Sequence, residues 1–249
     1  MSRFFNKIRK TILDSGQMKK YSIYALGEII LVVIGILIAL QINNWNETEK
    51  AKAKEVESLK NLVQDLKFDL ISFERNKQTI TDIAKSYHQL YEIGVKNIDT
   101  IKINTPNNIR RLPYYNPIIT DKNPLTIGVI SNETIKQEIL NYFRAMVDMN
   151  DSYGEFEYVI QRRLRIFLSD KQVHDLPGWF ENKDMRYKSG IYKNFIKAED
   201  LVKLSKTPEF QQLLLEASIK AEESLMALNA LMEQNKKLIA SIENSLPEK

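Results

Sequence analysis

The sequence predicts an all-α protein in which one membrane-spanning helix continues into a domain of long helices. Three observations lead to this prediction. Of the 249 residues only 8 are Gly and 7 are Pro, so few residues break a helical backbone. One apolar run is long enough to cross a bilayer, and two further stretches repeat apolar residues at helical spacing.

The composition excludes several classes of protein. Apolar residues make up 43% of the chain and charged residues 27%, a balance typical of a chain with a buried core. There is no Cys, which excludes disulfide frameworks and thiolate chemistry, and there are only two His. The motifs of phosphate loops, dinucleotide sites, zinc proteases and serine hydrolases are also absent from the sequence. We therefore expect no enzymatic activity, no cofactor and no metal site.

The formal net charge of +4 comes from the first 20 residues. This basic arm, residues 1–20, holds six Lys or Arg and one acid, whereas residues 29–249 hold 30 bases and 30 acids. A nucleic-acid binder is expected to carry a basic face on its folded domain, and the absence of net charge argues against one, so we expect no nucleic acid among the partners. The arm has an amphipathic pattern that suits a helix on an anionic cytoplasmic leaflet, although a plain basic flank needed only for insertion explains it equally well.

Residues 21–45 form the predicted transmembrane signal anchor. The run Ile29–Leu40 is entirely apolar, and within Tyr21–Ile42 only Glu28 and Gln41 are strongly polar. At 1.5 Å per residue, a helix of this length extends roughly 33 Å, enough for a hydrocarbon core of ~30 Å. A buried helix of a soluble protein is the alternative.

Aromatic residues and charges predict the orientation of this span. Tyr21 and Tyr24 at one end and Trp45 at the other suit the two membrane interfaces. The basic arm is expected to stay in the cytoplasm, which places residues 46–249 in the periplasm of a bacterial cell. The sequence Ile38–Gln41 is a poor match to a cleavage site, so we expect an uncleaved anchor in the inner membrane.

One face of the predicted span carries Glu28, Val32, Gly35 and Ala39. Gly35 and Ala39 have the spacing of small residues that let two membrane helices approach closely. Glu28 lies about 9 Å from the centre of the span, on the cytoplasmic side. We expect a helix–helix interface in which Glu28 meets a donor on a partner. The alternative is a carboxyl group that is protonated or reaches the lipid headgroups.

A resemblance supports the membrane anchor. The segment Tyr24–Glu47 (YALGEIILVVIGILIALQINNWNE), after the arm sequence Phe4–Arg9 (FFNKIR), resembles an uncharacterised family of single-span membrane proteins of Gram-negative bacteria. The resemblance covers residues 3–47 and continues only loosely, with the segment Ser131–Ile135. It implies an inner-membrane anchor with a periplasmic domain, and no particular activity. It also implies that seven residues act as a unit: Gly27, Glu28, Gly35, Gln41, Asn43, Asn44 and Trp45.

The periplasmic domain, residues 46–249, is expected to begin with a helix over about 46–95 that runs directly out of the span. Its apolar residues follow two heptad positions, Val56, Val63, Leu70, Lys77, Ala84, Tyr91 and Leu59, Leu66, Phe73, Ile80, Tyr87, Gly94. Lys77 interrupts the first series. The two series predict a seam that buries one face of the helix.

A second long helix is predicted over 207–246. Thr207 suits the N-cap and Pro208 the first helical position. The apolar series of this helix is Phe210, Leu214, Ala217, Ala221, Leu225, Leu228, Leu231, Leu238 and Ile242. We expect both seams to form an intramolecular bundle core, with an intermolecular coiled coil as the alternative.

The segments 97–131 and 170–206 are predicted to be irregular. The first is rich in Pro, and its isoleucines at 101, 103, 118 and 119 suggest a small hairpin. A helix is expected to follow Ser131 as its N-cap, and another to cover Tyr153–Leu168.

Seven basic and aromatic residues of the middle region are candidate contacts for a ligand or partner. They are Arg110, Arg111, Tyr114, Tyr115, Arg162, Arg163 and Arg165. Arginine forks and aromatic faces suit an anionic ligand or peptide, whereas a solvated helix face and a packed loop explain the same residues without a ligand.

Together these features predict a non-enzymatic scaffold or accessory subunit that associates through helices. Its expected partners are the lipid bilayer and either further copies of itself or other membrane-protein subunits. A periplasmic sensing module that signals through its span is the alternative. A hydrolase with a dispersed carboxylate site is the least favoured reading.

Overall fold

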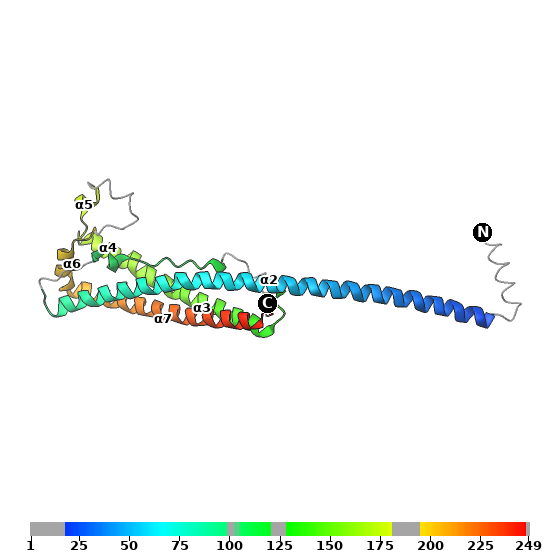
Figure 1. The fold of residues 1–249 in the computed structure, drawn as a ribbon. Coiled ribbons are helices and arrows are strands. Elements are labelled where there is room, and N and C mark those ends of the chain that lie inside the picture. Colours follow the sequence, from blue (N-terminus) through cyan, green and yellow to red (C-terminus); the bar gives the residue numbers. More distant parts are fainter. Residues whose placement is uncertain (1–17, 99–102, 104, 121–127, 181–194, 248–249) are drawn as a thin grey trace. The chain divides into compact units, whose positions relative to one another are not determined.

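The computed structural model describes residues 18–98, 103, 105–120, 128–180 and 195–247 (Figure 1). The predicted basic arm and the side chains of Tyr21 and Tyr24 lie outside this description. Every element within it is helical, and His174 and Ile196 form an isolated β-bridge. The predicted all-α fold class is therefore confirmed.

The chain forms two compact units, Met1–Val56 and Glu57–Lys249, which we call unit 1 and unit 2. Helix α2, Met18–Val95, contributes to both units and is not interrupted at their boundary. The expected span and the expected helix that follows it are thus one helical element.

Unit 2 is built from three long helices that lie side by side (Figure 1). These are α2 from Glu57 onward, α3, Glu133–Tyr158, and α7, Pro208–Ser245. A π-helix, η4, Val159–Leu164, joins α3 to α4, Arg165–Asp170. The helix expected over Tyr153–Leu168 is therefore the end of one longer rod. Two short helices, α5, Leu176–Phe180, and α6, Ala198–Ser205, lie before α7.

The core register of α2 differs in part from the expected seam. The series with Leu59, Leu66, Phe73, Ile80 and Tyr87 is buried as predicted. In the other series only Val63 is fully buried. From Leu70 onward, the buried residue is the one directly before each predicted residue. The residues in those positions are Asp69, Asn76, Ile83 and Leu90. The shift escaped prediction because the first two of them are polar.

The expected seam of α7 is confirmed. Apart from the half-buried Leu225, all of its members lie in the core, together with the polar residues Ser224 and Asn235. Thr207 occupies the N-cap position and Pro208 begins the helix. The Thr207 hydroxyl donates to the carbonyl of Leu204 at 2.7 Å and thus ties α7 to the end of α6.

The segment 105–119 is an extended strap rather than a hairpin. It contains the short helix η1, Pro106–Arg110, and leads into η2, Ile118–Thr120, which takes up two of the four isoleucines expected in the hairpin. Residue 101, another of the four, lies outside the described residues. The strap runs back along α2 (Figure 1). Asn132, not Ser131, caps α3, because its side chain accepts the N–H groups of residues 134 and 135 at 3.0 and 3.2 Å.

Candidate functional site

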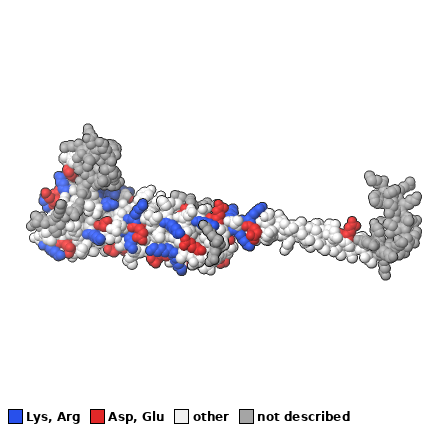
Figure 2. Space-filling model, in the orientation of Figure 1, with Lys and Arg blue, Asp and Glu red and all other residues white. Residues whose placement is uncertain are grey.

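The part of α2 in unit 1 carries apolar side chains that no other described residue covers. The large apolar side chains within Ile29–Leu40 are each between 47% and 73% exposed. The most apolar window of this helix has a mean hydropathy of 2.6, and none of it is buried. Figure 2 shows a stretch almost free of charged side chains, whereas both signs of charge cover unit 2. By length and composition the helix is a candidate membrane span, as a signal sequence near the amino terminus would also be.

The predicted interface residues lie on this exposed helix. Glu28, Val32, Gly35 and Ala39 are all exposed, and Trp45 is 67% exposed. A Cβ atom at Gly35 would meet nothing within 4 Å. Since a glycine in a helix costs roughly 0.5–1 kcal/mol relative to alanine, the described chain itself gives no reason for a glycine there.

Polar side chains of the helices hold the backbone of the strap. Tyr87 Oη donates to the carbonyl of Ile109 at 3.0 Å, and Tyr153 Oη donates to that of Pro113 at 2.8 Å. Asn76 Nδ2 donates to the carbonyl of residue 114 at 3.1 Å. The Asp69 carboxylate accepts the N–H groups of residues 118 and 119 at 2.7 and 3.3 Å. These contacts satisfy backbone groups that an extended segment cannot satisfy within itself.

None of these clamping side chains was among the predicted site residues. The signal that could have found them is a polar residue in a core heptad position, as for Asp69 and Asn76. Burial also acts on the tyrosines: it raises the pKa of Tyr87 well above the usual value, against a smaller opposing effect of the Arg165 charge. The phenol therefore stays protonated and remains a hydrogen-bond donor.

The seven candidate contacts do not converge on one place. Tyr115 is half-buried against the core, where its ring stacks on Phe73 at a centroid distance of 6.0 Å and lies 5.9 Å from the ring of Tyr153. Tyr114 is 80% exposed, and Arg111 bonds within the strap to Asn108. The exposed arginines of η4 are Arg162 and Arg163, and the second of these forms an ion pair with Glu216 of α7.

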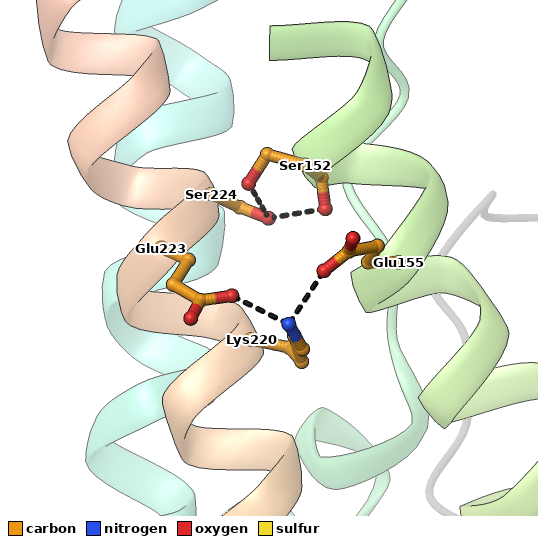
Figure 3. Close-up of polar contacts among 5 residues, drawn as sticks. All are labelled: Ser152, Glu155, Lys220, Glu223 and Ser224. Carbon is orange, nitrogen blue, oxygen red and sulfur yellow. Dashed lines mark hydrogen bonds and ion pairs between the residues drawn. The ribbon is translucent and has the colours of Figure 1, made fainter. Parts of the chain in front are cut away.

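A shallow groove between α3 and α7 has three of its charged residues, Glu155, Glu216 and Lys220, in ion pairs. Lys220 of α7 lies between Glu155 and Glu223 and bonds to both (Figure 3). Beside it the hydroxyl of Ser224 donates to the carbonyl of Ser152 at 3.1 Å. The groove is lined by Asn150, Asp151, Gly154, Glu155, Tyr158, Val159, Glu216 and Lys220. Its ion pairs join the two helices, which leaves little charge for a ligand.

Two of the predicted arginines do meet, at the far end of the strap. Arg165 donates from Nε and Nη2 to the carbonyl of Arg110 at 3.2 and 2.9 Å. The guanidinium carbon of Arg110 lies 4.6 Å from the centre of the Phe195 ring, and the His174 ring stacks on that same ring at 5.9 Å. We call Arg110, Arg165, His174 and Phe195 the basic corner. Neither at the basic corner nor elsewhere do the described residues contain a group of three or more His, Asp or Glu that could hold a metal ion.

Comparison with known proteins places the sequence with an uncharacterised group. The sequence profile of the Family of unknown function (DUF6090) matches residues 28–152, half of the chain. The matched range begins in the exposed apolar part of α2 and includes the strap and α3 as far as Ser152. No curated protein and no solved structure matches the chain.

Proposed function

We propose that this chain, which belongs to the family of unknown function DUF6090, is a single-span membrane protein that acts by associating with other proteins rather than by catalysis. In this proposal the apolar part of α2 crosses the bacterial inner membrane. The basic arm stays in the cytoplasm, and unit 2 works in the periplasm as a scaffold or accessory subunit.

The exposed apolar residues of α2 carry this proposal. Helices of soluble proteins that contain such a run bury it, because apolar surface in water costs about 25 cal/mol per Å². In the described chain the run Ile29–Leu40 has no protein cover at all. The hydrocarbon core of a bilayer would remove this cost, and a helix satisfies its own backbone hydrogen bonds there.

The same helix favours an anchor that is retained over a signal peptide that is removed. Signal peptides end in a short apolar run followed by small residues at a cleavage site. Here α2 continues as a regular helix past Ala39 and Trp45 to Val95, and this helix includes the region where a cleavage site would lie. An anchor that stays attached would tether unit 2 to the membrane.

Association within the membrane is proposed to use the face with Glu28, Val32, Gly35 and Ala39. Small residues let two helix backbones approach, and a carboxyl group at such an interface gains a partner that lipid tails cannot offer. We propose a second copy of the span as the occupant of this face. Other membrane-protein subunits are the alternative outcome.

Blue-native electrophoresis of the full-length protein in a mild detergent tests the association. We expect an oligomer for the wild type, and its loss or weakening in Gly35→Leu and Glu28→Gln. Leu37→Ala is the control. It also changes the side-chain volume, at an exposed position about 180° around the helix from Glu28. A monomeric wild type, or equal effects of Gly35→Leu and Leu37→Ala, would contradict the proposed face.

A sensing module remains the second candidate function. The observation that favours it is the basic corner, where unit 2 gathers cationic groups on aromatic rings. Because a sensor needs a ligand, this function depends on whether that corner binds one.

A further inference from the structure

We propose that the basic corner binds a small oxyanion, a phosphate or carboxylate group, between the side chains of Arg110, Arg165 and His174. This inference concerns unit 2 alone. It does not depend on how the span associates, and it deepens the sensing alternative by naming the chemical class of the ligand.

The Arg165 guanidinium is held in place with donors to spare. Its Nε and Nη2 atoms donate to the carbonyl of Arg110 at 3.2 and 2.9 Å, so that carbonyl fixes the plane of the group. A guanidinium has five N–H groups, and these two bonds use only two of them. The others are available for the bidentate contacts that arginine makes with oxyanions.

The Arg110 guanidinium is held through its face rather than its edge. It lies 4.6 Å from the centre of the Phe195 ring, a cation–π contact. The backbone N–H of Phe195 donates to the buried Asn107 at 3.3 Å, and Trp179 meets the edge of its ring at 5.3 Å. A guanidinium stacked in this way keeps its N–H edges free for an acceptor in its own plane.

The cations of the basic corner differ from the cations of the α3–α7 groove in their partners. Among the described residues, no hydrogen bond or ion pair joins a carboxylate to Arg110, Arg165 or His174. Asp175, next to His174 in sequence, bonds instead to the N–H of Gly178 at 3.1 Å. This differs from the α3–α7 groove, where the ion pairs neutralise the cations.

The electrostatics of the corner would favour a bound anion. Burial, and after it the charge of Arg165, lower the pKa of Arg110. Burial, and after it the charge of Arg110, lower the pKa of His174. Each cation is therefore disfavoured by its neighbours, and a bound anion would reverse this effect for both.

Calorimetric titration of the full-length protein in mild detergent tests the site. The probes are inorganic phosphate and succinate, each compared with sodium chloride at equal ionic strength. We expect one saturable site for at least one probe, and binding weaker by at least about tenfold in Arg110→Gln, the cost of losing a charge-assisted contact. Arg162→Gln is the matched control, since that arginine is exposed on η4 and has the same charge.

Nuclear magnetic resonance of the two histidines gives a second readout, which a merely structural role of Arg110 would not produce. Saturating phosphate or succinate should raise the pKa of His174. At constant pH, the ring signals of the exposed His88 should not move. The proposal is overturned if neither probe binds beyond chloride. It is equally overturned if Arg162→Gln weakens binding as much as Arg110→Gln, or if the two histidines respond alike.

Discussion

Alanine substitutions at two glycines of unit 2 should change its stability in opposite directions. Gly94 lies in the last turn of α2, and Gly154 lies near the end of α3, where the helical backbone continues into η4. A Cβ atom at Gly94 would overlap the carbonyl oxygen of Ser205 and the side-chain amide of Gln211, and would lie 2.8 Å from the Ser205 carbonyl carbon. A Cβ atom at Gly154 would meet nothing within 4 Å.

The expected magnitudes follow from these surroundings. In an open helical position, replacing glycine by alanine gains roughly 0.5–1 kcal/mol through the lower entropy of the unfolded chain, and this is the prediction for Gly154→Ala. At Gly94 the same gain is opposed by overpacking of about 1–3 kcal/mol, because the obstacle is backbone that cannot rotate away. The Ser205 carbonyl also accepts the Gln211 amide at 2.9 Å, a bond that the new methyl group would displace.

Thermal unfolding of the full-length protein in mild detergent, followed by circular dichroism at about 222 nm, measures both effects. A change of 1 kcal/mol shifts Tm by roughly 2–4 °C in a domain of this size. Gly154→Ala should therefore raise Tm by a few degrees and Gly94→Ala should lower it. If Gly94→Ala is as stable as the wild type, α2 does not pack against the junction of α6 and α7 as described.

Three further predictions address the strap and the corner. Asp69→Ala should lower the free energy of unfolding by roughly 2–4 kcal/mol in urea titrations, because two strap amides lose their acceptor. Hydrogen exchange of these two amides should also become faster. Glu74→Ala, at an exposed position, should change neither quantity. As the pH falls through the usual titration range of a histidine, around pH 6.5, the wild type should lose stability, because burial and, after it, the charge of Arg110 lower the pKa of His174 and the unfolded chain takes up the proton first. The loss should be smaller in His174→Gln, and equal slopes in the two proteins would contradict this assignment. Saturating phosphate should reduce the same pH dependence, and should fail to do so in Arg110→Gln.

The sequence predicted the elements whose signals are local. The start of α7 follows from Thr207 and Pro208, whose backbone preferences act within one turn. The apolar series of α7 and the Leu59 series of α2 also stood out, because every member is apolar or aromatic except Gly94. The continuity of α2 could be expected because nothing near Trp45 disfavours a helix.

The remaining features depend on partners distant in sequence. Asp69 and Asn76 occupy core positions where the strap brings backbone groups to them, and the sequence does not show which backbone groups those are. The strap itself has no apolar alternation, since its backbone is satisfied by side chains instead of a second strand. Of the seven predicted contacts, Arg110 and Arg165 came together because the start of α4 and the strap meet, a contact between residues 55 positions apart.

The orientation of unit 2 across the membrane tests the central claim most directly. Alkaline phosphatase folds to an active enzyme only in the periplasm, and green fluorescent protein exported in unfolded form stays dark there. With each reporter fused after Lys249, we predict active phosphatase and dark fluorescent protein in living cells, and the reverse for fusions after Lys20, before the span. An inactive phosphatase with a bright fluorescent partner after Lys249, both well expressed, would contradict an anchor that carries unit 2 into the periplasm.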